Sequence, residues 1–129
     1  VIIRPSGIYG EERLMRIRQV KEKQLEALPQ YDWTNRIMDT DLVTIITQVL
    51  SLSDAEQVRP IYLATDYAPV TSFELTSWLA TELNSNPPTL QVSNEDKPIS
   101  GKRLHSNIPL DWLQYPDWQS GYAHILKAK

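Results

Sequence analysis

The sequence predicts an α/β fold, because stretches typical of buried β-strands alternate with amphipathic helical patterns. The chain opens on Val-Ile-Ile, an apolar β-branched run of the kind that forms buried parallel strands. A helical pattern follows over residues 11–28, and a second apolar run, residues 60–65, precedes a helix with its own capping signal. The 129 residues suffice for one compact region with a buried core.

The first strand is expected over residues 1–4. Pro5 ends it by removing a backbone donor, and the serine and glycines that follow allow tight turning. Residues 11–28 favour an amphipathic helix, since strong helix formers dominate and leucine and isoleucine recur on one face before Pro29. The first third of the chain therefore predicts a strand, a loop and a long helix.

A short extended piece is expected over residues 36–39. Asp41 stands just before an apolar helical pattern over residues 42–50, where aspartate is a favoured N-cap, and the spacing of the apolar side chains predicts their burial. Residues 51–59 are polar and turn-like. Residues 60–65 then predict a buried strand with proline at its tolerated first position.

Thr71, followed three positions later by a glutamate, forms a capping box and predicts a helix over residues 73–83. A second short strand is expected over residues 89–93, and the polar, lysine-bearing residues 93–103 predict a mobile loop. In the tail, aromatic residues alternate with turn residues before a final helical stretch to Lys127.

Composition excludes several classes of function. A net charge of -3 and a pI near 5.3 argue against a nucleic-acid partner, which requires a surplus of basic side chains. The longest apolar stretch is too short to cross a membrane. The absence of cysteine excludes disulfides and a thiolate nucleophile and permits a cytoplasmic location. His105 and His124 form no metal-ligand pattern, so no metal is expected.

Five segments, in order, resemble the extended short-chain dehydrogenases. Arg-Pro-Ser-Gly-Ile-Tyr-Gly at residues 4–10 is similar to the strand-loop that follows their catalytic Tyr-x-x-x-Lys helix. Residues 35–43 resemble the Asn-Arg-Ile-His-x-x-Asp-Leu stretch, and residues 61–80 resemble the strand, Asp-x-x-Pro-Val-Thr turn and helix of that family. Residues 101–107 and 115–126 resemble the tail of nucleoside-diphosphate-sugar epimerase-like proteins within the NAD-dependent epimerase/dehydratase family.

The resemblance implies the C-terminal part of a Rossmann-like NAD(P)-binding fold with a small substrate lobe of short parallel strands and helices. Residues 1–129 would form a single substrate-side region, with the N-terminal cofactor-binding part outside the chain. It places Pro5, Ser6, Gly7 and Ile8 beside the nicotinamide of NAD or NADP, where glycine would also permit close backbone approach. The alternative interpretation of this segment is a plain strand-ending turn.

The substrate-binding residues expected on the same basis are Asn35 and Arg36, together with Arg13. Thr34 stands where better-known sugar-nucleotide epimerases carry an arginine, and Met38 stands where many relatives carry histidine. Threonine lacks the planar guanidinium group through which arginine donates two parallel hydrogen bonds to a phosphate. A diphosphate would therefore have to be bound by Arg13, Arg36 or another residue. A solvated surface arginine is the alternative in each case.

The 129 residues contain neither Gly-x-Gly-x-x-Gly nor Tyr-x-x-x-Lys, so we assign no catalytic residue to this chain. The parent activity expected is that of an NAD(P)-dependent epimerase/dehydratase or related oxidoreductase acting on a nucleotide-sugar-like or small hydroxyl substrate. The alternative is a non-catalytic binding or assembly module of the same fold. The chain opens within an apolar run and without methionine, which suggests a truncated chain. The partners expected are therefore the missing N-terminal region and, through the exposed strand edge, a second copy in a homo-oligomer.

Overall fold

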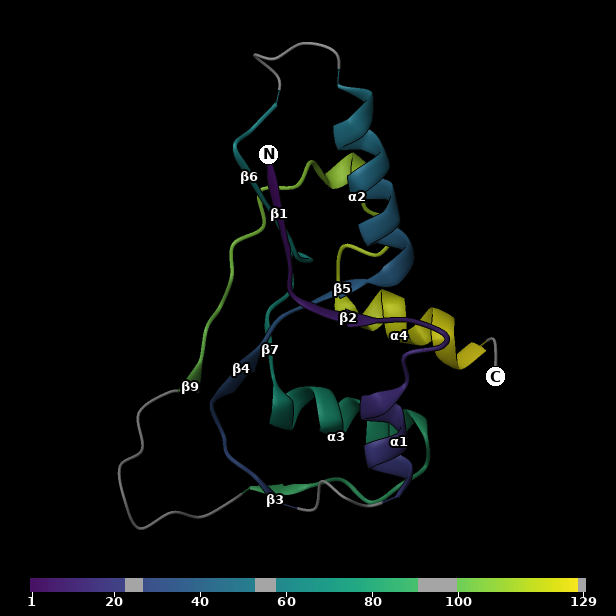
Figure 1. Cartoon of the computed structure of the whole chain (residues 1–129). Coiled ribbons are helices and arrows are strands. Elements are labelled where there is room, and N and C mark those ends of the chain that lie inside the picture. The colour runs from purple at the N-terminus through teal and green to yellow at the C-terminus, as the bar shows by residue number, and fades with distance from the viewer. Residues whose placement is uncertain (23–26, 53–57, 91–99, 128–129) are drawn as a thin grey trace. The chain divides into compact units, whose positions relative to one another are not determined.

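The computed structural model describes residues 1–22, 27–52, 58–90 and 100–127 (Figure 1). These residues fall into two compact units, each built from separated parts of the chain. Unit 1 comprises Val1–Arg13, Asn35–Pro69 and Leu104–Lys129, and unit 2 comprises Leu14–Thr34 and Val70–Arg103.

Unit 1 contains two parallel strand pairs. β1 (Ile2–Pro5) pairs with β6 (Ile61–Ala64), and β2 (Gly7–Tyr9) pairs with β5 (Arg36–Met38). Ser6 is the single residue between β1 and β2, so the chain passes directly from one pair to the other (Figure 1). Parallel pairing requires long crossover connections, which this chain provides between the paired strands. The predicted α/β class is confirmed. The first strand is also present, but it includes Pro5, and its predicted burial is wrong: Ile3 is half-buried, whereas the other residues of β1 are exposed.

The core of unit 1 lies between the strands and helix α2 (Asp39–Ser51). Ile3, Ile8, Leu42, Val49 and Trp112 pack against the fully buried side chains. The buried members of this core are Ile37, Ile45, Tyr62, Ala64, Ile108 and Leu113. The predicted helix is confirmed here, and its inward face is the one that carries Ile45.

Two further elements complete unit 1. They are the 3-10 turn η1 (Leu110–Trp112) and helix α4 (Trp118–Lys127). Helix α4 buries Trp118, Tyr122 and Ile125, whose four- and three-residue spacing puts them on one helical face. The final helix therefore begins earlier than the sequence predicted, because two of the tail aromatic residues serve as its buried face.

Unit 2 is built around short strands. β4 (Asp32–Thr34) pairs antiparallel with β7 (Val70–Thr71) and parallel with β9 (Ser100–Gly101). β3 (Ala27–Leu28) and β8 (Thr89–Leu90) form a separate parallel pair. The predicted loop over residues 93–103 is thus wrong at its C-terminal end, where β9 lies beside β4. Residues 91–99 lie outside the described part of the chain.

Helices α1 (Met15–Lys21) and α3 (Ser72–Glu82) pack together in unit 2. The hydroxyl of Thr71 accepts a hydrogen bond from the Glu74 backbone N–H over 3.1 Å, which confirms the predicted N-terminal cap of α3. No helix in the described ranges is both long and apolar enough to cross a membrane.

The predicted helix over residues 11–28 is wrong in extent. The backbone N–H of Arg13 donates to the carbonyl of Gly10 over 3.1 Å, and this turn keeps residues 10–13 out of the helix. At the other end, Leu28 is buried in β3, where pairing with β8 overrides its helix propensity. Residues 23–26 of the predicted helix lie outside the described part of the chain.

Three predictions in unit 1 also need correction. Gly7 lies in β2 and not in a turn, because it pairs with Arg36 of β5. Asp41 does not cap α2, which begins at Asp39; its side chain makes the contacts with the segment before α4 described below. Ile46 and Leu50 were expected to be buried, yet they lie on the solvent-exposed side of the helix.

Candidate functional site

In the predicted nicotinamide segment, Pro5 and Ser6 lie at the carboxyl ends of β1 and β6, and Gly7 and Ile8 are the first residues of β2. Pro5 is exposed, and Ile8 is half-buried against the core of unit 1. The hydroxyl of Ser6 donates to the Thr65 hydroxyl over 2.8 Å, and its backbone N–H donates to the Ala64 carbonyl over 3.2 Å. In open α/β folds the carboxyl ends of parallel strands are where ligands bind. The role of this segment beside a nicotinamide stays a prediction.

Gly7 and Asn35 fix the same segment from the neighbouring strand. The Gly7 N–H donates to the Asn35 carbonyl over 3.2 Å, and a Cβ on Gly7 would lie only 3.1 Å from that oxygen. The side chain of Asn35 accepts a hydrogen bond from the Leu104 N–H over 2.9 Å. Close strand pairing therefore provides a structural reason for glycine at position 7, and Asn35 joins three segments of unit 1.

The structure places the two predicted substrate arginines in different surroundings. Arg13 is exposed at the end of the turn that follows β2, whereas Arg36 is buried within unit 1. Arg36 donates through Nη1 to the Tyr122 hydroxyl over 3.3 Å, and its guanidinium lies 5.9 Å from the centroid of that ring. The two arginines predicted as alternatives for a diphosphate clamp therefore differ in accessibility, and their role in binding stays a prediction.

Arg36 belongs to what we call the buried polar cluster, formed by Tyr9, Arg36, Asp66 and Tyr122. The rings of Tyr9 and Tyr122 stack with their centroids 4.6 Å apart. The backbone N–H of Asp66 donates to the Arg36 carbonyl over 2.9 Å, which brings the Asp66 side chain to the same region. All four residues are at most 6% exposed.

Burial dominates the electrostatics of this cluster. It raises the pKa of Asp66 to about 7, against the lowering effects of a hydrogen bond from the Ala68 N–H and of the Arg36 charge. Burial also raises the pKa of Tyr9 well above its ordinary value, and the Asp66 charge adds to that effect. Within the described residues, neither Asp66 Oδ2 nor the Tyr9 hydroxyl has a hydrogen-bond partner. The cluster thus holds a carboxyl group that changes charge near neutral pH.

Sequence reasoning did not find this cluster. Tyr9, Asp66 and Tyr122 are far apart in the chain, and none of them lies in a spacing pattern that signals chemistry. The only available signal was the Asp-x-x-Pro-Val-Thr turn of the family resemblance, which begins at Asp66.

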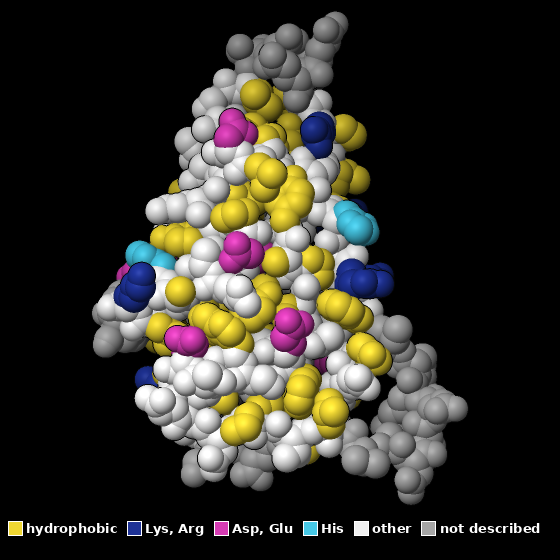
Figure 2. All heavy atoms as spheres, turned by 180° about the vertical axis from the view of Figure 1, so that it is seen from behind, with side chains coloured by type: hydrophobic (Ala, Val, Ile, Leu, Met, Phe, Trp, Pro, Cys, Tyr) yellow, Lys and Arg dark blue, Asp and Glu magenta, His cyan; other side chains and the backbone are white. Residues whose placement is uncertain are grey.

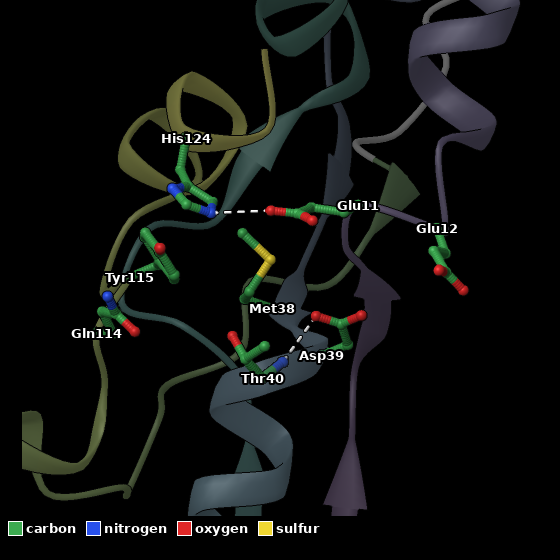
Figure 3. A pocket seen from close by; sticks show the side chains of 8 residues that line it. All are labelled: Glu11, Glu12, Met38, Asp39, Thr40, Gln114, Tyr115 and His124. Atoms are coloured by element: carbon green, nitrogen blue, oxygen red, sulfur yellow. Dashed lines mark hydrogen bonds and ion pairs between the residues drawn. The ribbon is translucent and has the colours of Figure 1, made fainter. Parts of the chain in front are cut away.

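A pocket of about 460 Å³ lies in unit 1 at the carboxyl ends of the second parallel pair, β2 and β5 (Figure 3). Its walls come from the turn after β2, the end of β5, the first turn of α2, the segment before α4, and α4 itself. The lining residues are Glu11, Glu12, Met38, Asp39, Thr40, Gln114, Tyr115 and His124. None of the site residues predicted from the sequence lines this pocket.

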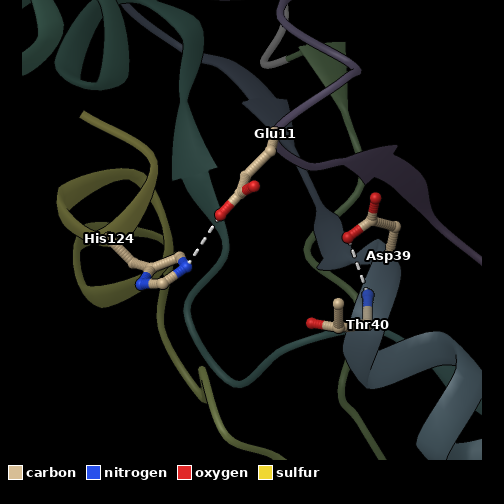
Figure 4. Close-up of polar contacts among 4 residues, drawn as sticks. All are labelled: Glu11, Asp39, Thr40 and His124. Carbon is tan, nitrogen blue, oxygen red and sulfur yellow. Dashed lines mark hydrogen bonds and ion pairs between the residues drawn. The ribbon is translucent and has the colours of Figure 1, made fainter. Parts of the chain in front are cut away.

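Two polar contacts order the pocket wall (Figure 4). His124 Nε2 and Glu11 Oε1 are 3.1 Å apart, and the Thr40 N–H donates to Asp39 Oδ1 over 2.7 Å. A Cβ on Gly10 would lie 2.2 Å from Asp39 Oδ2, so only glycine at position 10 leaves this carboxylate its place. The described residues contain no group of three or more His, Asp or Glu side chains that could hold a metal ion.

The parallel strand pairs with their covering helices define part of a Rossmann-type α/β protein. The chain is similar over 99% of its length to a solved structure described as a "putative NAD-dependent epimerase/dehydratase" from Methylobacillus flagellatus, with 30% identity and a TM-score of 0.76, and it covers 46% of that chain. The match supports the predicted family resemblance, and its coverage is consistent with a C-terminal portion.

A second solved structure, a functionally unknown conserved protein from Silicibacter pomeroyi DSS, matches 98% of this chain with 21% identity and a TM-score of 0.70. At that identity the similarity shows the fold alone. The chain covers 48% of it, so it spans about half the length of each of these structures. A scan of protein-family models and a search of curated proteins gave no match.

Proposed function

We propose that this chain forms the substrate-side portion of an NAD(P)-dependent epimerase/dehydratase or related oxidoreductase. The substrate class proposed is a nucleotide-sugar-like or other small hydroxyl compound. The observation that carries the proposal is the 30% identity, over 99% of the chain, to a protein described as belonging to that class. The position of Pro5 and Ser6 at the carboxyl ends of β1 and β6 supports it.

In this proposal Pro5, Ser6, Gly7 and Ile8 form a wall beside the nicotinamide of NAD or NADP. The N–H groups of Ser6 and Gly7 are already used within unit 1. The segment therefore fits a rigid surface for ring packing better than a loop of free N–H donors. The cofactor would supply hydride transfer, and this chain's part is to position the ring and the substrate.

Unit 1 also offers an apolar surface for the proposed N-terminal cofactor-binding partner. Val1 and Ile2 of the first strand are 71% and 49% exposed. On α2, Val43, Ile46 and Leu50 are exposed at helical spacing and form one stripe. Figure 2 shows hydrophobic side chains in several groups on the face it presents, between scattered charged ones. Contiguous apolar surface is typical of interaction sites, so the stripe on α2 supports the proposed partner.

The same surface favours a second candidate function, a non-catalytic assembly module that pairs with another copy. The two candidates differ in how the protein responds to cofactor. We propose titrating NADH and NADPH against the full-length product, with binding followed by energy transfer from tryptophan to the nicotinamide. Saturable binding supports the oxidoreductase. A protein that binds neither and self-associates in sedimentation experiments supports the module.

A matched pair of variants links binding to this chain. In Gly7→Val the added side chain meets the Asn35 carbonyl and disturbs the proposed nicotinamide wall, so cofactor affinity should fall. Ser77→Ala on α3 of unit 2 provides a control, because its hydroxyl donates within its own helix. Equal cofactor affinity in Gly7→Val and in the unaltered protein would contradict the proposed role of residues 5–8.

A further inference from the structure

We propose that the pocket at the carboxyl ends of β2 and β5 binds a small organic ammonium ion. Its cationic group would lie against Glu11 and Asp39, and its apolar stem against Met38 and Tyr115 (Figure 3). The site is separate from the nicotinamide segment, and this inference does not depend on the proposed oxidoreductase function.

The cavity has the size and place of a ligand site. Its volume of about 460 Å³ falls within the roughly 300 to 1,000 Å³ of small-molecule pockets. It lies at a carboxyl edge of parallel strands, the edge at which α/β proteins bind ligands. A bare metal ion would leave most of this volume unused. In addition, the described residues contain no group of three or more acidic or histidine side chains placed so that they could hold a metal ion.

The charges of the lining favour a cation. Glu11, Glu12 and Asp39 contribute carboxylates, and no lysine or arginine lines the pocket. His124 is the one basic side chain of the lining; it lies 3.1 Å from one oxygen of Glu11, and the second oxygen of that carboxylate is left for a ligand. A phosphate or carboxylate ligand would meet like charge there, whereas an ammonium group would find charge-assisted acceptors. In Figure 3 the side chain of Glu11 points toward His124 across the pocket, while that of Glu12 points away from the other lining residues. Glu11 and Asp39 are therefore the carboxylates assigned to the ligand.

The opposite wall suits an alkyl stem. Met38 is buried, with a polarisable thioether, and the Tyr115 ring lies 5.2 Å from the His124 ring. An aromatic face and a thioether together attract the polarised methylenes beside an ammonium group. A ligand without an apolar stem gains nothing from this wall.

The wall is already ordered before any ligand binds. Asp39 is held by the Thr40 N–H, and the missing Cβ of Gly10 makes room for it. Asp41 fixes the backbone of Gln114 and Tyr115 through hydrogen bonds of 2.9 Å each. Preorganised groups lose less entropy on binding, which is what a small ligand with few contacts needs.

Three probes of similar length test the assignment on the full-length protein. They are 1,4-diaminobutane, 1,4-butanediol and succinate, which are dicationic, neutral and dianionic. Amide chemical shifts recorded during titration should move for residues around Glu11, Asp39 and Tyr115 with the diamine alone. Binding of the diol or succinate as tight as that of the diamine would overturn the proposal.

Variants separate the pocket from general charge attraction. Glu11→Gln and Asp39→Asn should each weaken diamine binding about tenfold or more, the loss typical of a removed charge-assisted contact. Glu82→Gln, at an exposed position at the end of α3 in unit 2, lowers the net negative charge equally and should leave binding unchanged. Equal weakening in all three variants overturns the site. Glu11 is exposed and outside any helix, so its variant remains a fair test if Asp39→Asn destabilises α2.

Discussion

The carboxylate of Asp41 accepts a hydrogen bond from the backbone N–H of Tyr115 over 2.9 Å. Its second oxygen accepts one from the Gln114 N–H over the same distance. Asp41 is 2% exposed, so the first turn of α2 is joined to the segment before α4 by a buried, doubly bonded side chain. The contact also positions two residues of the pocket wall.

Replacing Asp41 should therefore destabilise unit 1. In Asp41→Ala the backbone N–H groups of Gln114 and Tyr115 lose the charged acceptor that they share, and the free energy of unfolding should fall by about 2 to 4 kcal/mol. Asp41→Asn keeps one acceptor oxygen and should have an intermediate effect. Asp111→Asn, at an exposed position on η1, is the matched control. Urea unfolding of the three variants measures the difference, and equal midpoints would contradict a tethering role.

Asp66 predicts a pH-dependent stability. Its pKa is about 7 in the folded protein against an ordinary value of 3.8, so the folded state binds this proton more tightly than the unfolded state. The protonated Asp66 carboxyl therefore contributes to the free energy of unfolding. This contribution is full below pH 3.8, declines as the pH rises toward 7 and is lost above pH 7. The change should not exceed a few kcal/mol. Measured by urea unfolding between pH 5 and 8, the free energy of unfolding should depend less on pH in Asp66→Asn than in the unaltered protein. An unchanged pH dependence would mean that other groups cause it.

Gly121 and Tyr9 predict a coupled pair of variants. A Cβ on Gly121 would lie 1.9 Å from the Tyr9 hydroxyl. Alanine gains about 1 kcal/mol in helix propensity over glycine, but overpacking costs about 1 to 3 kcal/mol, so Gly121→Ala should destabilise on balance. Tyr9→Phe alone should be close to neutral, because that hydroxyl has no hydrogen-bond partner in the described ranges. In the double variant, part of the stability lost in Gly121→Ala should be recovered, and thermal unfolding would measure it. If the effects of the two substitutions simply add, the proposed contact between the Cβ and the Tyr9 hydroxyl is contradicted.

Thr71 tests the best sequence-level signal in unit 2. Thr71→Ala removes the acceptor of the Glu74 N–H and should cost about 1 kcal/mol. Thr71→Ser keeps the hydroxyl and should retain most of the stability. Comparable thermal midpoints for the alanine and serine variants would mean that the cap contributes nothing.

Local patterns predicted the elements that local energetics decide. The Thr71 cap of α3, the apolar strands β1 and β6 and the helix after β5 were all recognisable from spacing and residue type. Leu28 was not, because its place in β3 depends on a partner about sixty residues away. The prediction that Asp41 caps a helix was wrong for the same reason. Its carboxylate oxygens accept hydrogen bonds from backbone N–H groups that lie more than seventy positions later in the chain.

The candidate sites divide in the same way. The end of the first strand could be predicted near Pro5 because proline lacks the backbone N–H that would continue the pairing. The ammonium pocket could not be foreseen, since Glu11, Asp39 and His124 meet only when three distant segments fold together. The buried polar cluster is equally non-local: Arg36 and the turn that begins at Asp66 stand in recognisable segments, but nothing in the sequence indicates that they meet Tyr9 and Tyr122.

The interleaving of the two units has a consequence during synthesis. Unit 2 has all its segments once Arg103 has left the ribosome, whereas unit 1 waits for Leu104–Lys129. Until α4 emerges, the nascent Tyr9 and the apolar strands around it lack the helix that shields them. A premature stop near residue 104 should therefore release a chain with one unit complete and the other open to chaperones, proteases and aggregation.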